Sequence, residues 1–442
     1  MEVISPYTAI IGVSLIIIIS YFFNVISQKT NIPSVLMLIV LGLLIKQGMT
    51  IVGFSVGDLI FNVLELLGIV GLIMIVLEAA LDLRLTKEKW PTIWKSFSVA
   101  LLSLVLSAGA CAYIINFFII DDFFVALVYA VPLSIMSSAI IIPSVGALPE
   151  NKKEFMVYEG TFSDILGIMF FYFLIGNAGA ENAKVVVMDV VGNITLTIVL
   201  SIVISYGLVL IFQRMTSHVK LFLLISVLLI LYSVGKLFHL SSLLIILVFG
   251  LVLNNNKLFF RGFLKRWIEP TKVNRVLEDF HLVTIETAFV VRTFFFVIFG
   301  ITITLSSLLN FEVAIISVCV LIALYLVRYI FIKIFVWKDI VPQVFLSPRG
   351  LITILLFFAI PQEYQTEEFN SGILLYTIII SCIIMAVALV ANGKKVIPIE
   401  DMSFIHGPSQ KLPKEIKAEE IIELKKVGPI TNEEEGDPIS EN

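Results

Sequence analysis

Residues 158–167 read Tyr-Glu-Gly-Thr-Phe-Ser-Asp-Ile-Leu-Gly and place two carboxylates, Glu159 and Asp164, inside an apolar run. The run is long enough to cross a hydrocarbon core, which takes a helix of about 20 residues. Ionisable groups are costly there, so each one is a candidate functional residue. Gly160 and Gly167 share a helical face with Asp164, so this face carries little side-chain bulk and could border a cavity. Glu159 points about 140° away around the helix, so the two carboxylates need not share a site.

The composition of the whole chain agrees with a membrane location for this stretch. Of the 442 residues, 59% are hydrophobic and only 14% are charged, and the mean hydropathy is +1.04. A soluble domain carries about 25% charged residues. The composition therefore predicts a multi-pass membrane protein in contact with lipid, and it excludes water-soluble enzymes and nucleic-acid binders.

Polar, glycine and proline residues divide the chain into thirteen apolar runs. They lie near residues 6–26, 32–45, 59–81, 96–119, 123–147, 155–177, 185–212, 219–236, 240–253, 282–305, 311–335, 344–360 and 372–391. We expect an all-α membrane protein with about thirteen transmembrane helices in residues 1–392. Residues 393–442 are polar and acidic, and they predict a largely disordered cytoplasmic tail.

The loop charges predict an orientation. With thirteen spans and an outer N-terminus, nineteen lysines and arginines lie in the inner loops and three in the outer loops. Lys and Arg accumulate on the cytoplasmic side of membrane proteins. We therefore expect the N-terminus outside and the C-terminus in the cytoplasm, in a cell membrane.

Two of the runs contain helix-breaking residues. The fifth run carries Pro132 and Pro143, and the twelfth carries Pro348 and Gly350. Such residues either kink a helix or break it, and a break frees backbone carbonyls that could hold a cation. Runs five and six match runs twelve and thirteen if the seventh is a linker. This spacing predicts two inverted six-helix repeats with a site near the bilayer midplane, as in many transporters.

The segment from Glu159 to Ser163-Asp164 resembles the Glu-x-x-x-Asn-Asp motif of monovalent cation:proton antiporters, the sodium/proton exchanger superfamily. Further similar strings follow in the same order along the chain: Leu77–Leu83, Phe294–Gly300, Arg328 and Arg349-Gly350. The resemblance implies the antiporter fold with crossed broken helices, in a homodimer whose core domain moves against a dimerisation domain. It also implies that Asp164 alternately holds a cation or a proton, and that Glu159 forms a structural ion pair with Arg328.

The expected cation ligands are oxygens of Asp164, Ser163, Ser137 and Ser138, because hard monovalent cations prefer oxygen. Sodium-selective relatives have Asn at the position of Ser163 and Thr-Asp-Pro near Ser137, so Li⁺ and K⁺ stay open beside the favoured Na⁺. With one titrating carboxylate, the simplest exchange is one cation for one proton by alternating access, and it is electroneutral. Arg349 and Arg292 are possible accessory residues. Glu65, Glu78, Glu286 and Arg292 itself are expected to pair structurally or to anchor span ends.

Two other functions compete with a sodium/proton antiporter. A potassium/proton antiporter would share the fold, and a gated cation channel would conduct without moving protons. An intramembrane enzyme is disfavoured, because all four histidines lie in loops or at span ends and no second aspartate faces Asp164. The sequence indicates no cofactor and no catalytic residue.

Overall fold

The computed structural model describes ten segments of the chain, in which helices are joined by turns and short unwound stretches. These segments are residues 6–30, 32–51, 59–83, 85–146, 148–177, 183–213, 220–237, 242–260, 269–302 and 310–392. The predicted acidic tail, residues 393–442, lies outside the described residues.

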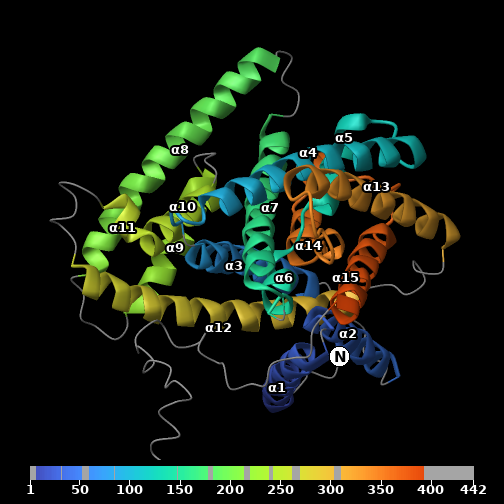
Figure 1. The fold of residues 1–442 in the computed structure, drawn as a ribbon. Helices are drawn as coiled ribbons and strands as arrows, with labels where there is room; N and C mark the ends of the chain where they lie inside the picture. The colour runs from blue at the N-terminus through green and yellow to red at the C-terminus, as the bar shows by residue number, and fades with distance from the viewer. Residues whose placement is uncertain are drawn as a thin grey trace, which may run out of the picture. The chain divides into compact units, whose positions relative to one another are not determined.

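Each of the thirteen predicted runs corresponds to one helix or, in two cases, to a helix interrupted by unwound chain (Figure 1). The α-helices are α1 (Pro6–Thr30), α2 (Ser34–Ile51), α3 (Leu59–Asp82), α4 (Trp90–Phe118), α5 (Phe123–Ser134), α6 (Ser138–Ser144), α7 (Glu150–Gly176), α8 (Ala183–Phe212), α9 (Lys220–Leu237), α10 (Ser242–Asn254), α11 (Asn256–Phe259), α12 (Pro270–Thr302), α13 (Phe311–Phe335), α14 (Leu351–Phe358) and α15 (Gly372–Asn392). Short 3-10 turns, Gln343–Phe345 and Gln362–Tyr364, flank α14.

Eight helical segments in the described residues are long and apolar enough to cross a membrane, and three shorter apolar stretches accompany them. The prediction of an all-α, multi-pass membrane protein is therefore confirmed. The start of α12 is the largest difference from the predicted runs: the helix begins at Pro270, well before the expected residue 282.

The helices pack in two groups. Helices α4–α7 and α13–α15 pack mainly on one another. Helices α2, α3, α10 and α12 form the second group, in which α12 runs alongside α2 and α3 (Figure 1). Fewer contacts join the groups, chiefly between α3 and α14 and between α7 and α10. The predicted core and dimerisation subdomains stay a prediction, and this grouping is compatible with them.

Two glycines allow α2 and α12 to touch backbone to backbone. A Cβ atom added at Gly42 would lie 2.2 Å from the carbonyl oxygen of Val297 and 2.8 Å from the Cα of Gly300. One added at Gly300 would lie 2.4 Å from the carbonyl oxygen of Ile39. Small residues allow this close approach between membrane helices, where packing replaces the hydrophobic effect as the driving force.

We predict that Gly42→Val destabilises the protein, because the new side chain must push α12 away. Overpacking of this kind costs about 1 to 3 kcal/mol. Thermal unfolding of the purified protein in detergent measures the loss. Gly48→Val is the matched control, since Gly48 lies on the same helix with nothing within 4 Å of its added Cβ. Equal melting temperatures for the two variants would contradict the close α2–α12 crossing.

Candidate ion-binding site

The two interrupted helices cross where each is unwound. Residues 135–137 separate α5 from α6, and residues 346–350 precede α14. The backbone N–H of Ser137 donates to the carbonyl of Pro348 at 2.9 Å. A Cβ atom at Gly350 would lie 2.7 Å from Cδ1 of Ile140 and 2.8 Å from Oγ of Ser137, so a larger residue there would force side chains at the crossing to move. The predicted crossed broken helices are confirmed, and the alternative of simple kinks is wrong.

Asp164 lies on α7 against the first of these breaks and is buried. Its Oδ2 atom accepts a hydrogen bond from the backbone N–H of Ser138 at 3.0 Å and another, short one from the Ser138 hydroxyl. Its Oδ1 atom is buried and has no hydrogen-bond partner. Half of this carboxylate therefore holds the N-terminus of α6, and the other half is free to bind an ion or a proton.

The neighbouring hydroxyls divide into two kinds. The hydroxyl oxygen of Ser163 accepts from the backbone N–H of Met136 at 3.0 Å, so it supports the unwound chain. The hydroxyls of Ser137 and Thr161 are buried without partners. Thr161 is absent from the predicted ligand set, although its position one helical turn before Asp164 is a sequence signal that points to it.

The glycine face of α7 does not border a cavity as expected. A Cβ atom at Gly167 would lie 2.3 Å from Cγ1 of Ile135. The small residues instead let α7 pack tightly on the unwound segment, which places Asp164 at hydrogen-bonding distance from Ser138.

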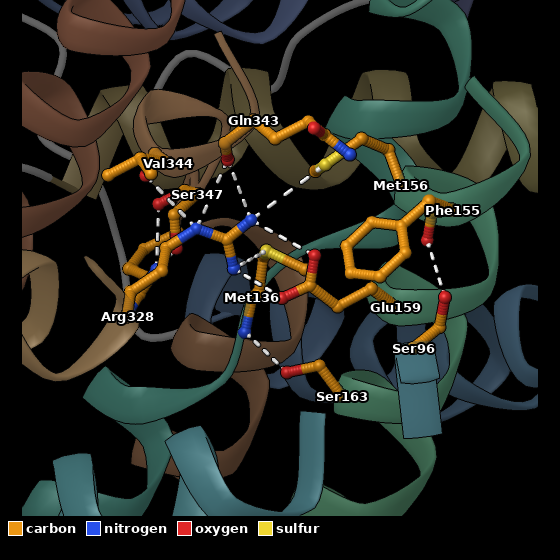
Figure 2. Close-up of polar contacts among 11 residues, drawn as sticks. Ser96, Met136, Phe155, Met156, Glu159, Ser163, Arg328, Gln343, Val344 and Ser347 are labelled. Atoms are coloured by element: carbon orange, nitrogen blue, oxygen red, sulfur yellow. Dashed lines mark hydrogen bonds and ion pairs between the residues drawn. The ribbon is translucent and has the colours of Figure 1, made fainter. Parts of the chain in front are cut away.

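Glu159 and Arg328 face each other in a buried, bidentate ion pair (Figure 2). Nη1 of Arg328 lies 2.5 Å from Oε1 of Glu159, and Nη2 lies 3.0 Å from Oε2. The two residues are 1% and 4% exposed. Arg328 also donates to the carbonyls of Gln343 at 2.8 Å and Val344 at 3.0 Å. Glu159 and Asp164 thus have different partners, as their angular separation on the helix indicates.

Arg349 joins the two breaks to each other. Its Nε donates to the carbonyl of Leu133 at 2.8 Å, and its Nη1 donates to the carbonyl of Ser347 at 2.7 Å. Its backbone N–H donates to the hydroxyl of Ser381. Within the described residues, no carboxylate lies at ion-pair distance from this guanidinium. We expected the freed carbonyls to be available for a cation, but these ones accept hydrogen bonds from arginine.

Arg292 and Glu78, two of the weaker candidates, are not among the hydrogen-bond partners of Asp164. Arg292 of α12 pairs with Glu78 of α3, with Nη2 and Oε2 2.9 Å apart. Glu286 is exposed, and the side chain of Glu65 lies outside the described residues. The described part of the chain contains no cluster of His, Cys, Asp and Glu that could hold a metal ion. Arg292 and Glu78 thus form the kind of structural pair that we expected for these residues.

The chain is similar to known proteins in sequence and in fold. Residues 13–392 match the family described as "Sodium/hydrogen exchanger, transmembrane". The fold resembles the sodium proton antiporter MjNhaP1 from Methanocaldococcus jannaschii at pH 8, with a TM-score of 0.64, 19% identity and coverage of 87% of this chain and 98% of that one. The fold also resembles an electron-microscopy structure of the same antiporter, with a TM-score of 0.65 and 17% identity. That match covers 88% of this chain and 96% of the other one. No curated protein matches the sequence significantly.

We predict that Glu159→Ala and Arg328→Ala each destabilise the protein by about 3 to 5 kcal/mol, because each leaves one buried charge without its partner. The melting temperature in detergent and the yield of folded protein measure the loss. The double variant Glu159→Leu with Arg328→Met removes both charges, so it should lose less than the two single variants combined. Single variants with wild-type melting temperatures would show that the pair contributes no stability.

Proposed function

This chain belongs to the sodium/hydrogen exchanger family of cation/proton antiporters, which are transporters and not enzymes, and on that premise we propose that it exchanges Na⁺ for H⁺ one for one by alternating access. The observation that carries the proposal is the Asp164 carboxylate, buried at the crossing of two broken helices with one oxygen unpartnered. The proposed protein is a homodimer in a cell membrane, with its N-terminus outside and its C-terminus in the cytoplasm.

In this proposal, exchange results from competition between a proton and a cation for Asp164. A proton and a cation need the same carboxylate oxygens, so one load excludes the other. The unpartnered hydroxyl of Ser137 and the hydroxyl of Ser138 would add further oxygen ligands, which hard cations prefer. A hydroxyl rotates about its C–O bond. Ser138 can therefore donate to an empty carboxylate and offer a lone pair when a cation is bound. In this proposal Ser163 positions the break, and Thr161 is an additional ligand candidate.

The proposed stoichiometry rests on the number of free buried carboxylates. Among the described residues, Glu159 and Asp164 are the buried acidic side chains, and Glu159 is neutralised by Arg328. Asp164 has no ion-pair partner at bonding distance within the same residues. One carboxylate carries either one proton or one monovalent cation, so the transported charge cancels.

The identity of the cation and the channel alternative are tested together. Vesicles that contain the protein and a pH-sensitive dye are exposed to Na⁺, Li⁺ or K⁺ in turn. We expect the largest proton movement with Na⁺. A response to K⁺ alone would identify a potassium/proton antiporter, and cation uptake without proton movement would identify a channel.

We predict that Asp164→Asn abolishes cation-driven proton movement, because the amide keeps the size of the side chain but neither releases a proton nor offers a full negative charge. The same dye assay measures the loss, and an unchanged elution volume in gel filtration shows that the variant is folded. Asp121→Asn, in an exposed turn, is the matched control and should keep full activity. Exchange that persists in Asp164→Asn would remove Asp164 from the proposed role.

We predict that transport is electroneutral and insensitive to membrane potential, since Ser163 beside Asp164 cannot ionise. Currents recorded on solid-supported membranes after a Na⁺ concentration jump provide the measurement. We expect no sustained current in vesicles whose dye signal reports active exchange. A sustained current that scales with exchange would require a second titrating group and would refute the one-for-one stoichiometry.

A further inference from the structure

A small polar cavity lies between α4, α7, α13 and the two unwound segments. Five serines line it, together with Glu159, Arg328 and Arg349. The centre of a water molecule can occupy about 20 Å³ of it, which is room for one water or one small ion. Asp164 does not line this cavity; its hydrogen bonds run to Ser138. The cavity therefore lies beside the proposed cation site, with Ser163 in its wall, but does not include the Asp164 carboxylate.

The charges around the cavity do not balance. Both carboxylate oxygens of Glu159 accept hydrogen bonds from Arg328, so that pair is neutral. Arg349 is 4% exposed and donates to backbone carbonyls and to the Ser347 hydroxyl, which are dipoles and not full charges. An arginine cannot lose its proton in a protein. The lining residues thus leave one full positive charge without a counter-charge, and a buried charge in that state is costly.

The cavity also offers a free hydrogen-bond donor. The hydroxyl of Ser103, on α4, is buried and has no partner. Buried polar atoms in folded proteins are nearly always paired, so an unpaired one points to a bound water or ion. Guanidinium N–H groups have no acceptor capacity, and a hydroxyl that faces an anion donates to it.

We propose that this cavity binds one small monovalent anion of the chloride class, held by the guanidinium of Arg349 and the hydroxyl of Ser103. The anion supplies the counter-charge of Arg349 and so stabilises the crossing that Arg349 ties together. Larger anions such as gluconate do not fit a space of this size. Its proposed ligands, Arg349 and Ser103, are not among the ligands proposed for the transported cation.

Thermal unfolding of the full chain in detergent tests the proposal. The protein is melted in sodium gluconate with increasing replacement by sodium chloride or bromide, at constant sodium concentration and ionic strength. We expect a saturable rise in melting temperature with either halide. Ser103→Ala should raise the half-saturating halide concentration about tenfold, since a hydrogen bond to a charged group is lost.

Ser317→Ala is the matched control, because Ser317 is a buried serine of α13 that donates to the carbonyl of Val313 and does not line the cavity. It should leave the half-saturating concentration unchanged. Equal melting temperatures in halide and gluconate would show that water fills the cavity and would overturn the proposal. An unchanged halide response in Ser103→Ala would overturn it as well. Neither result bears on the Na⁺/H⁺ exchange assay, which is read separately.

Discussion

The unwound backbone at the helix crossing is the constraint on which this structure depends. Inside a membrane no water pairs with the N–H and C=O groups that a broken helix releases, so the protein must satisfy them itself. Here the two kinds of group have different partners. Two arginines, Arg328 and Arg349, donate hydrogen bonds to carbonyls on both sides of the crossing, those of Leu133, Gln343 and Ser347. Side-chain oxygens of Asp164 and Ser163, on α7, accept hydrogen bonds from backbone N–H groups at the α5–α6 break.

This division leaves one oxygen of Asp164 without a hydrogen-bond partner, whereas both oxygens of Glu159 are paired. Glu159 faces a guanidinium with matching fork geometry, and both of its oxygens are engaged. Asp164 faces an amide and a hydroxyl, which hold a single oxygen and add no positive charge. The same helix therefore carries one carboxylate held in an ion pair and one with a buried oxygen that has no hydrogen-bond partner. The difference arises from their separation of about 140° around α7.

Much of this arrangement is predictable from the sequence. Apolar run lengths predict the thirteen helical segments, proline and glycine predict the two breaks, and helical angle separates Glu159 from Asp164. The bond from Arg349 to the carbonyl of Leu133 is not predictable, because it joins positions more than two hundred residues apart. The early start of α12 escapes a hydropathy reading, because residues 270–281 are largely polar although they are helical. The roles of Ser163 and Ser103 depend on which hydroxyls find partners, and only the folded chain determines that.

The placement of the ion pairs bears on how such a site can be opened to either side. Glu159–Arg328 joins α7 to α13 within one helix group, and Glu78–Arg292 joins α3 to α12 within the other. Breaking a buried ion pair would cost several kcal/mol, roughly 3 to 5. A movement of one group against the other breaks neither pair, and it also keeps Asp164 on Ser138, since both belong to the first group. A rigid-body movement of one helix group against the other would therefore keep both ion pairs and the hydrogen bonds of the crossing intact.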